Sequence, residues 1–137
     1  MLSPSAANLQ PWEFLVIESE PLLSRVKEAY SRDWLQDAPQ ILVVSGFENQ
    51  AWQRRFDGYR SIETDLAIAM THLLLAATDE GVATCWISAF DPQTLAHALE
   101  LKEDQRVYGI TPLGYAAASV GRSPKTRKQL EQVVRFL

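Results

Sequence analysis

Cysteine and histidine are scarce in this sequence, which has one cysteine and two histidines among its 137 residues. Cys85 has no second thiol for an internal disulfide, and neither His72 nor His97 has a ligand-spaced partner, so no disulfide framework and no metal site is expected. No apolar run approaches the roughly 18 residues that a membrane-spanning helix needs, and no signal-peptide pattern opens the sequence. The formal net charge of −4 argues against nucleic-acid binding. These absences predict a cytoplasmic protein with neither a membrane nor a nucleic acid as partner.

The composition is that of an ordinary globular domain, with 47% apolar and 22% charged residues. The length suits a single domain over residues 1–137. Four apolar stretches predict strands, at residues 13–17, 41–44, 82–87 and 107–113. Helices are predicted between the strands, each with a terminal signal: Ser19 and Pro21, Ser61 and Gly81, Asp91 and Pro92. The tail adds four apolar residues at near-helical spacing, Leu130, Val133, Val134 and Leu137. Because strands and helices interleave, we expect an α+β or α/β three-layer domain, with the strand order left open.

The predicted helix from Ile62 to Asp79 is apolar nearly all round. One stripe contains Leu66 and Met70, whereas Ile68 and Leu75 lie on other faces. Such a helix must be buried on nearly all sides, and a chain this short has little material to wrap both sides of it. A second subunit could supply the other side, or the helix could be central in a two-layer monomer. We favour the homodimer.

Three segments, in this order, carry a resemblance to a known family. They are Pro-Ser-Ala-Ala-Asn-Leu-Gln-Pro-Trp at 4–12, Gly-Val-Ala-Thr-Cys-Trp-Ile-Ser-Ala-Phe-Asp at 81–91, and Ile-Thr-Pro-Leu-Gly-Tyr at 110–115 followed by the basic 124–128. On these segments the chain resembles the nitroreductase-like flavoproteins. The resemblance implies a central, mainly antiparallel sheet flanked by helices, a homodimer, and flavin mononucleotide (FMN) bound at the dimer interface.

The resemblance also implies the chemistry. NAD(P)H would be the transient electron donor, and a nitroaromatic, a quinone or a similar small molecule the acceptor, in a ping-pong oxidoreductase reaction. No side chain need act as acid or base, because the cofactor carries the reaction. The alternative is a degenerate member that keeps the dimeric fold as a flavin-binding or structural module.

One family feature is absent from the printed sequence. Members normally begin with a helix and an Arg-Arg-Ser-x-Arg type of segment, whose basic side chains hold the FMN phosphate and ribityl chain. This sequence starts downstream of that segment, as expected of a naturally short member, of a mis-assigned start or of a truncated chain. Two charge-assisted phosphate contacts, each worth about 1.5–3 kcal/mol, would be lost, and a weaker FMN affinity is expected.

The resemblance assigns cofactor contacts first to the turn before the first strand. Ser5 and Asn8 would present a hydroxyl and an amide to the polar edge of the flavin, with Gln10 nearby. From residue type alone, Ser5 and Asn8 would simply stabilise the turn. Trp12 fits the core and the wall of the cofactor site equally well.

The other two segments supply the remaining contacts. The segment that contains Trp86, Ser88 and Ala89 would pass alongside the flavin, with a backbone N–H donating to its N5 atom. Lys125 and Arg127 are the predicted phosphate ligands, with Lys128 and Arg122 as substitutes. The other interpretation of this basic run is a solvated tail. Cys85 is assigned to packing.

Overall fold

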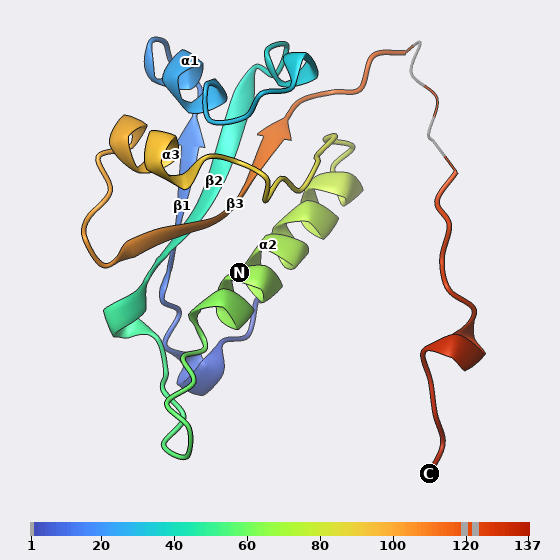
Figure 1. Ribbon diagram of the computed structural model, residues 1–137. Coiled ribbons are helices and arrows are strands. Elements are labelled where there is room, and N and C mark those ends of the chain that lie inside the picture. Colours follow the sequence, from blue (N-terminus) through green and yellow to red (C-terminus); the bar gives the residue numbers. More distant parts are fainter. Residues whose placement is uncertain (1, 119–120, 122–123) are drawn as a thin grey trace.

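A computed structural model describes residues 2–118, 121 and 124–137 and arranges them in three layers (Figure 1). The central layer is an antiparallel sheet in the order β1-β2-β3, formed by Trp12–Ile17, Gln40–Phe47 and Gln105–Leu113. Helices α1 (Leu22–Lys27) and α3 (Pro92–Ala98) cover one face, and α2 (Ile62–Asp79) covers the other. Short 3-10 turns complete the chain: η1 (Ala6–Asn8), η2 (Asp33–Leu35), η3 (Glu48–Gln50) and η4 (Leu130–Gln132). The expected α+β class and the antiparallel sheet are confirmed.

The central strand β2 is buried on both faces because its apolar side chains alternate between two cores. Ile41 and Val43 belong to the core beneath α1 and α3. Leu42 and Val44 belong to the core beneath α2. All four are at most 5% exposed, which explains why the sequence of this strand is an unbroken apolar run.

Helix α2 begins and ends where the sequence predicts, at Ile62 and Asp79. Leu66, Ala69 and Met70 lie on its inner face and are at most 1% exposed. Its outer face is open, and Leu75 is 64% exposed there. No helix in the described part of the chain has the length and apolar character that a bilayer crossing requires.

Two local predictions are wrong. Residues 82–87 form no strand; they make only two isolated bridges, Ala83 with Gly114 and Ile87 with Ile110. Helix α1 begins at Leu22 with Pro21 in the cap position and without a Ser19 side-chain cap. The tail contains η4 and no α-helix among residues 124–137, because its apolar residues pack against no other element there and so lack what stabilises a short helix.

Two cap predictions have different outcomes. Asp91 caps α3 as expected, since its carboxylate accepts the Gln93 N–H at 3.0 Å. Ser61 occupies the cap position of α2, but its hydroxyl donates to Asp65 Oδ2 at 2.7 Å instead of capping the helix.

Candidate active site

The turn that precedes β1 is anchored to α2 by one buried carboxylate. Asp65 is 2% exposed, and its Oδ1 accepts the backbone N–H of Ala6 at 2.9 Å. Its Oδ2 accepts the Ser61 hydroxyl. A second contact joins the same segments, between Ser3 Oγ and His72 Nδ1 at 3.1 Å. The N-terminal segment is thereby held against α2 over two of its turns.

The backbone of this turn is strained. Ala7, Asn8 and Gln10 have φ values of 50°, 55° and 52°, in the left-handed region that costs a residue with a side chain roughly 1–2 kcal/mol. Internal hydrogen bonds hold this shape: Ser5 Oγ accepts the Gln10 N–H at 3.0 Å, and Gln10 Nε2 donates to the Asn8 carbonyl at 3.2 Å. Strain of this kind persists only where surrounding structure enforces it, and it clusters at functional sites.

The strained turn leaves polar groups available to a ligand. Ser5 Oγ accepts one hydrogen bond and keeps its own O–H for donation. The Asn8 side-chain amide is exposed and makes no hydrogen bond within the described residues. The turn can therefore offer a hydroxyl and an amide to a polar partner without losing its own internal bonds.

Gly46 of β2 packs closely against both the end of the turn and α2. A Cβ at this position would stand 2.6 Å from the Pro11 carbonyl oxygen and 2.8–2.9 Å from the side chains of Ile62 and Leu66. Only glycine lets the turn, the sheet and α2 approach this closely.

The second predicted segment lies along β3. The Cys85 N–H donates to Thr111 Oγ1 at 3.1 Å, and Ile87 exchanges backbone hydrogen bonds with Ile110 at 2.9 and 3.0 Å. The segment is held again at Asp91, whose N–H donates to Ala29. Between these points Ser88 and Ala89 are exposed, and their backbone N–H groups make no hydrogen bond in the part of the chain that the structure describes. A fixed segment with two available donors suits a planar polar ligand.

The Trp86 side chain is half-buried and turned toward the sheet. Its ring packs edge-on against Tyr108, with centroids 5.6 Å apart. Its Nε1 donates to Ser88 Oγ at 2.9 Å and lies 3.1 Å from where a Gly109 Cβ would be. The backbone, more than the indole, is what this segment presents to solvent.

The predicted phosphate ligands lie apart from both segments. Lys125 and Arg127 are exposed, and the tail that carries them runs clear of the folded body (Figure 1). Within the described residues, the one side-chain hydrogen bond of the pair is from Arg127 to the Thr126 carbonyl. Lys128 is exposed too, and Arg122 lies outside the described residues.

One chain therefore does not assemble the predicted residues. The turn with Ser5 is held on the N-terminal half of α2, whereas the segment with Ser88 is held on β3, and no hydrogen bond joins the two among the described residues. Sequence reasoning missed Asp65, the residue that anchors the turn. A carboxylate beside the buried stripe of an otherwise apolar helix was the available signal, because a buried charge requires specific partners.

The outer face of α2 contains apolar depressions. One of about 520 Å³ is lined by Leu2, Ser3, His72, Leu73, Leu75 and Ala76. A smaller one of about 250 Å³ is lined by Ala67, Ile68, Thr71 and His72. An open apolar surface on a long helix is typical of an association or ligand surface.

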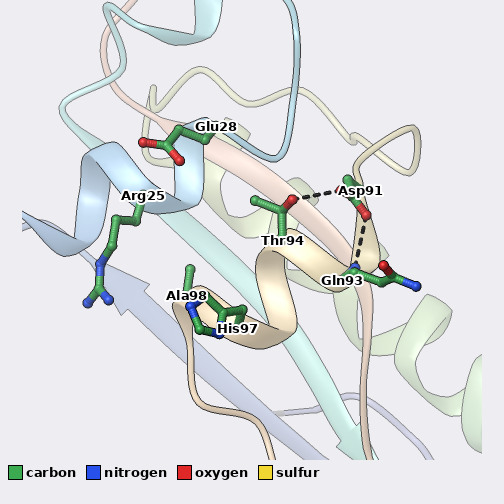
Figure 2. Close-up of a pocket in the computed structure, with 7 residues that line it drawn as sticks. All are labelled: Arg25, Glu28, Asp91, Gln93, Thr94, His97 and Ala98. Atoms are coloured by element: carbon green, nitrogen blue, oxygen red, sulfur yellow. Dashed lines mark hydrogen bonds between the residues drawn. The ribbon is translucent and has the colours of Figure 1, made fainter.

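Figure 2 shows a different pocket, a polar groove of about 400 Å³ between α1 and α3. Its most constrained group is Asp91, which also accepts the Thr94 hydroxyl at 2.7 Å. That hydroxyl and the Gln93 N–H hold the pKa of the Asp91 carboxyl below its ordinary value. Helix capping accounts for this arrangement, and none of the predicted site residues lines the groove.

Comparison with known proteins gives consistent matches. The family model described as "Nitroreductase family" matches residues 20–115. The crystal structure of a nitroreductase family protein from Clostridium difficile 630 superposes with a TM-score of 0.89 at 28% identity, over 98% of this chain and 78% of that one.

Two curated relatives extend the match in sequence. An Archaeoglobus fulgidus protein, provisionally named an NADH dehydrogenase/NAD(P)H nitroreductase, is 26% identical over 84% of this chain and 67% of its own length. An iodotyrosine dehalogenase 1 homolog from Caenorhabditis elegans is 25% identical over 98% of this chain and 50% of its own length. The chain thus spans between half and two-thirds of the length of these relatives.

Proposed function

Because the chain belongs to the nitroreductase family, we propose that it is an FMN-dependent oxidoreductase that works as a homodimer. NAD(P)H is the proposed donor, and a nitroaromatic, a quinone or a similar small molecule is the proposed acceptor. The donor agrees with the name of the Archaeoglobus fulgidus relative.

The strained turn anchored by Asp65 is the observation that carries this proposal. Contacts within the chain hold its shape, so the turn would need little further ordering to bind a ligand. The available Ser5 hydroxyl and Asn8 amide fit the carbonyl and ring-nitrogen edge of a flavin, and Gln10 supports them through its bond to the Asn8 carbonyl.

A second copy is proposed to complete the site. Pairing of two chains through the outer faces of α2 would cover Ile68 and Leu75 and bring segments from both chains to one interface. The exposed backbone N–H groups of Ser88 and Ala89 would then donate to the ring. The proposed phosphate ligands are Lys125 and Arg127, which are exposed on the C-terminal tail.

When bound, FMN would supply the redox chemistry, with hydride uptake from NAD(P)H and electron transfer to the acceptor. The chain binds the cofactor, orients its ring and limits the access of water. Ser5, Asn8 and the N–H groups of Ser88 and Ala89 fix the orientation, and the apolar outer face of α2 excludes water.

Titration of FMN with the protein, followed by fluorescence quenching, tests binding directly. Replacing Asn8 by alanine should weaken FMN binding by roughly 5–15-fold, which corresponds to one hydrogen bond of about 1–1.5 kcal/mol. Asn49→Ala, at another exposed asparagine, is the matched control and should bind as the parent does. Equal quenching by both variants would remove Asn8 from the site.

Turnover is tested on the FMN-saturated protein. Addition of NADH or NADPH should bleach the flavin absorbance, and a nitroaromatic or quinone should restore it. Binding without bleaching by either donor would favour the alternative, a flavin-binding module without NAD(P)H-dependent turnover.

Reductive dehalogenation is a second candidate because one relative that aligns with 98% of this chain, the Caenorhabditis elegans protein, carries a dehalogenase name. Release of iodide from iodotyrosine by the reduced, FMN-saturated protein would support it. Rapid reoxidation by nitroaromatics with no iodide release would leave the nitroreductase assignment in place.

A further inference from the structure

The loop of residues 51–61, here called the arginine hairpin, is hydrogen-bonded within itself and presents two side chains without an internal role. Gln53 and Arg60 form a β-bridge across it. The Arg54 N–H donates to the Tyr59 carbonyl at 2.8 Å, and the Ser61 N–H donates to the Trp52 carbonyl at 3.0 Å. Gly58, at φ +74°, closes the turn.

Most polar side chains of the hairpin are used internally. Arg54 forms a two-pronged ion pair with Asp57 at 2.8 and 2.6 Å and lies 4.8 Å from the centre of the Tyr59 ring. This pair holds the pKa of the Asp57 carboxyl below its ordinary value. The Arg60 guanidinium donates to the Glu48 carbonyl at 2.9 Å.

Arg55 and Phe56, at the tip, have no such role. Phe56 is 98% exposed, and Arg55 makes no side-chain hydrogen bond or ion pair among the described residues. An aromatic residue and an arginine on a pre-ordered support are the residue types that anchor protein interfaces. With three arginines and one aspartate the hairpin is positive, although the whole chain carries −4.

The opposite end of α2 has complementary charge. Asp79 and Glu80 are exposed at its C-terminus, and no basic residue lies in its last turn. Because the helix dipole already places partial negative charge there, these carboxylates add to an uncompensated negative end. Neither makes an ion pair within the described residues.

The hairpin and this acidic end lie at opposite ends of the same helix (Figure 1). The hairpin joins α2 at its start, where the Tyr59 hydroxyl bonds to Thr64. Between the two ends, the apolar depressions of the outer face extend from Ala67 to Ala76, around the middle of the helix. Two copies that pack there with their α2 helices antiparallel would bring each hairpin toward the acidic end of the other α2, whereas parallel copies would bring like charges together.

We propose that Arg55 and Phe56 form a contact with Asp79 and Glu80 of a second copy, and that this contact sets an antiparallel orientation of the two α2 helices. The inference rests on the homodimer of the proposed function. It adds the residues that determine the relative orientation of the two α2 helices. In a two-fold dimer the contact occurs twice, so its effect on the association constant is squared.

Charge reversal tests the contact, with the dimer dissociation constant measured by sedimentation. Arg55→Glu should weaken the dimer on the order of tenfold, since an exposed attraction becomes a repulsion at two places. Phe56→Ala should also weaken it. Arg55→Glu combined with Glu80→Lys should restore the dissociation constant to near that of the parent, because the pair is re-formed with its signs exchanged.

Arg32→Glu is the matched control, because it makes the same change in net charge at an exposed arginine outside the hairpin. This variant should leave the dimer unchanged.

Disulfide cross-linking tests the orientation of the two chains, in a Cys85→Ser background. Arg55→Cys combined with Glu80→Cys should give disulfide-linked dimers. Arg55→Cys combined with Glu63→Cys, at the other end of α2, should not. A dimer unaffected by Arg55→Glu, or weakened without rescue by Glu80→Lys, overturns this inference alone. A chain that is monomeric at all concentrations overturns it together with the proposed homodimer.

Discussion

The two faces of α2 are both apolar, but the inner face is buried and the outer face is exposed to solvent. Leu66 and Met70 on the inner face are at most 1% exposed and pack on the sheet, whereas Leu75 on the outer face is 64% exposed. The inner face holds the fold of one chain together, and the outer face is the surface that we propose is covered by a second copy. An apolar helix therefore reports on burial in the functional assembly, which can exceed burial within one subunit.

The largest expected effect comes from breaking the inner face. Leu66→Ala should lower the free energy of unfolding by about 2–5 kcal/mol, because it leaves a cavity between α2 and the sheet. Urea denaturation measures this. Leu75→Ala is the matched control on the outer face and should cost far less at concentrations where the chain is monomeric. Equal losses in the two variants would mean that the faces do not differ as described.

Removal of the carboxylate that joins α2 to the turn should have the next largest effect. Asp65→Ala leaves the Ala6 N–H and the Ser61 hydroxyl without their acceptor and should cost about 1.5–3 kcal/mol. Asp65→Asn keeps one acceptor oxygen and should cost less. We expect FMN affinity to fall with Asp65→Ala, since the strained turn loses its anchor. Unchanged affinity would separate the turn from the cofactor site.

Filling the space between α2 and β2 should have a smaller effect. Gly46→Ala places a methyl group 2.6 Å from the Pro11 carbonyl oxygen, so the turn or the helix must shift, at about 1–3 kcal/mol. Gly121→Ala is the control, because an added Cβ there would meet no other described residue within 4 Å. Thermal unfolding of the two variants makes the comparison. A stability loss no greater than that of the control would show that the close approach at Gly46 is not required.

The smallest effect on folding is expected on the outer face. Leu75→Glu should change the unfolding free energy of the monomer by no more than about 0.5 kcal/mol, because the side chain is already in water. The same variant should abolish dimer formation by placing a charge on the association surface. Sedimentation at high concentration measures whether this variant still forms a dimer. A dimer that persists would mean that the interface lies on another surface.

Local sequence patterns were sufficient for several regular elements of this protein. The bounds of α2, the double burial of β2 and the Asp91 cap follow from apolar periodicity and capping chemistry within a few residues. The segment before β1 was informative in a different way, since its residue order carries the family resemblance that the match over residues 20–115 supports independently.

Contacts between distant segments decided the rest. Asp65 acquires its role from Ala6, 59 residues earlier, and residues 82–87 make only isolated bridges to β3 in place of a strand. The near-helical spacing of the tail gives no α-helix among residues 124–137, because its apolar residues have nothing to pack against within the described chain. Periodicity specifies which side chains avoid water, but the partner of each buried carboxylate and backbone N–H is chosen only when remote parts of the chain meet.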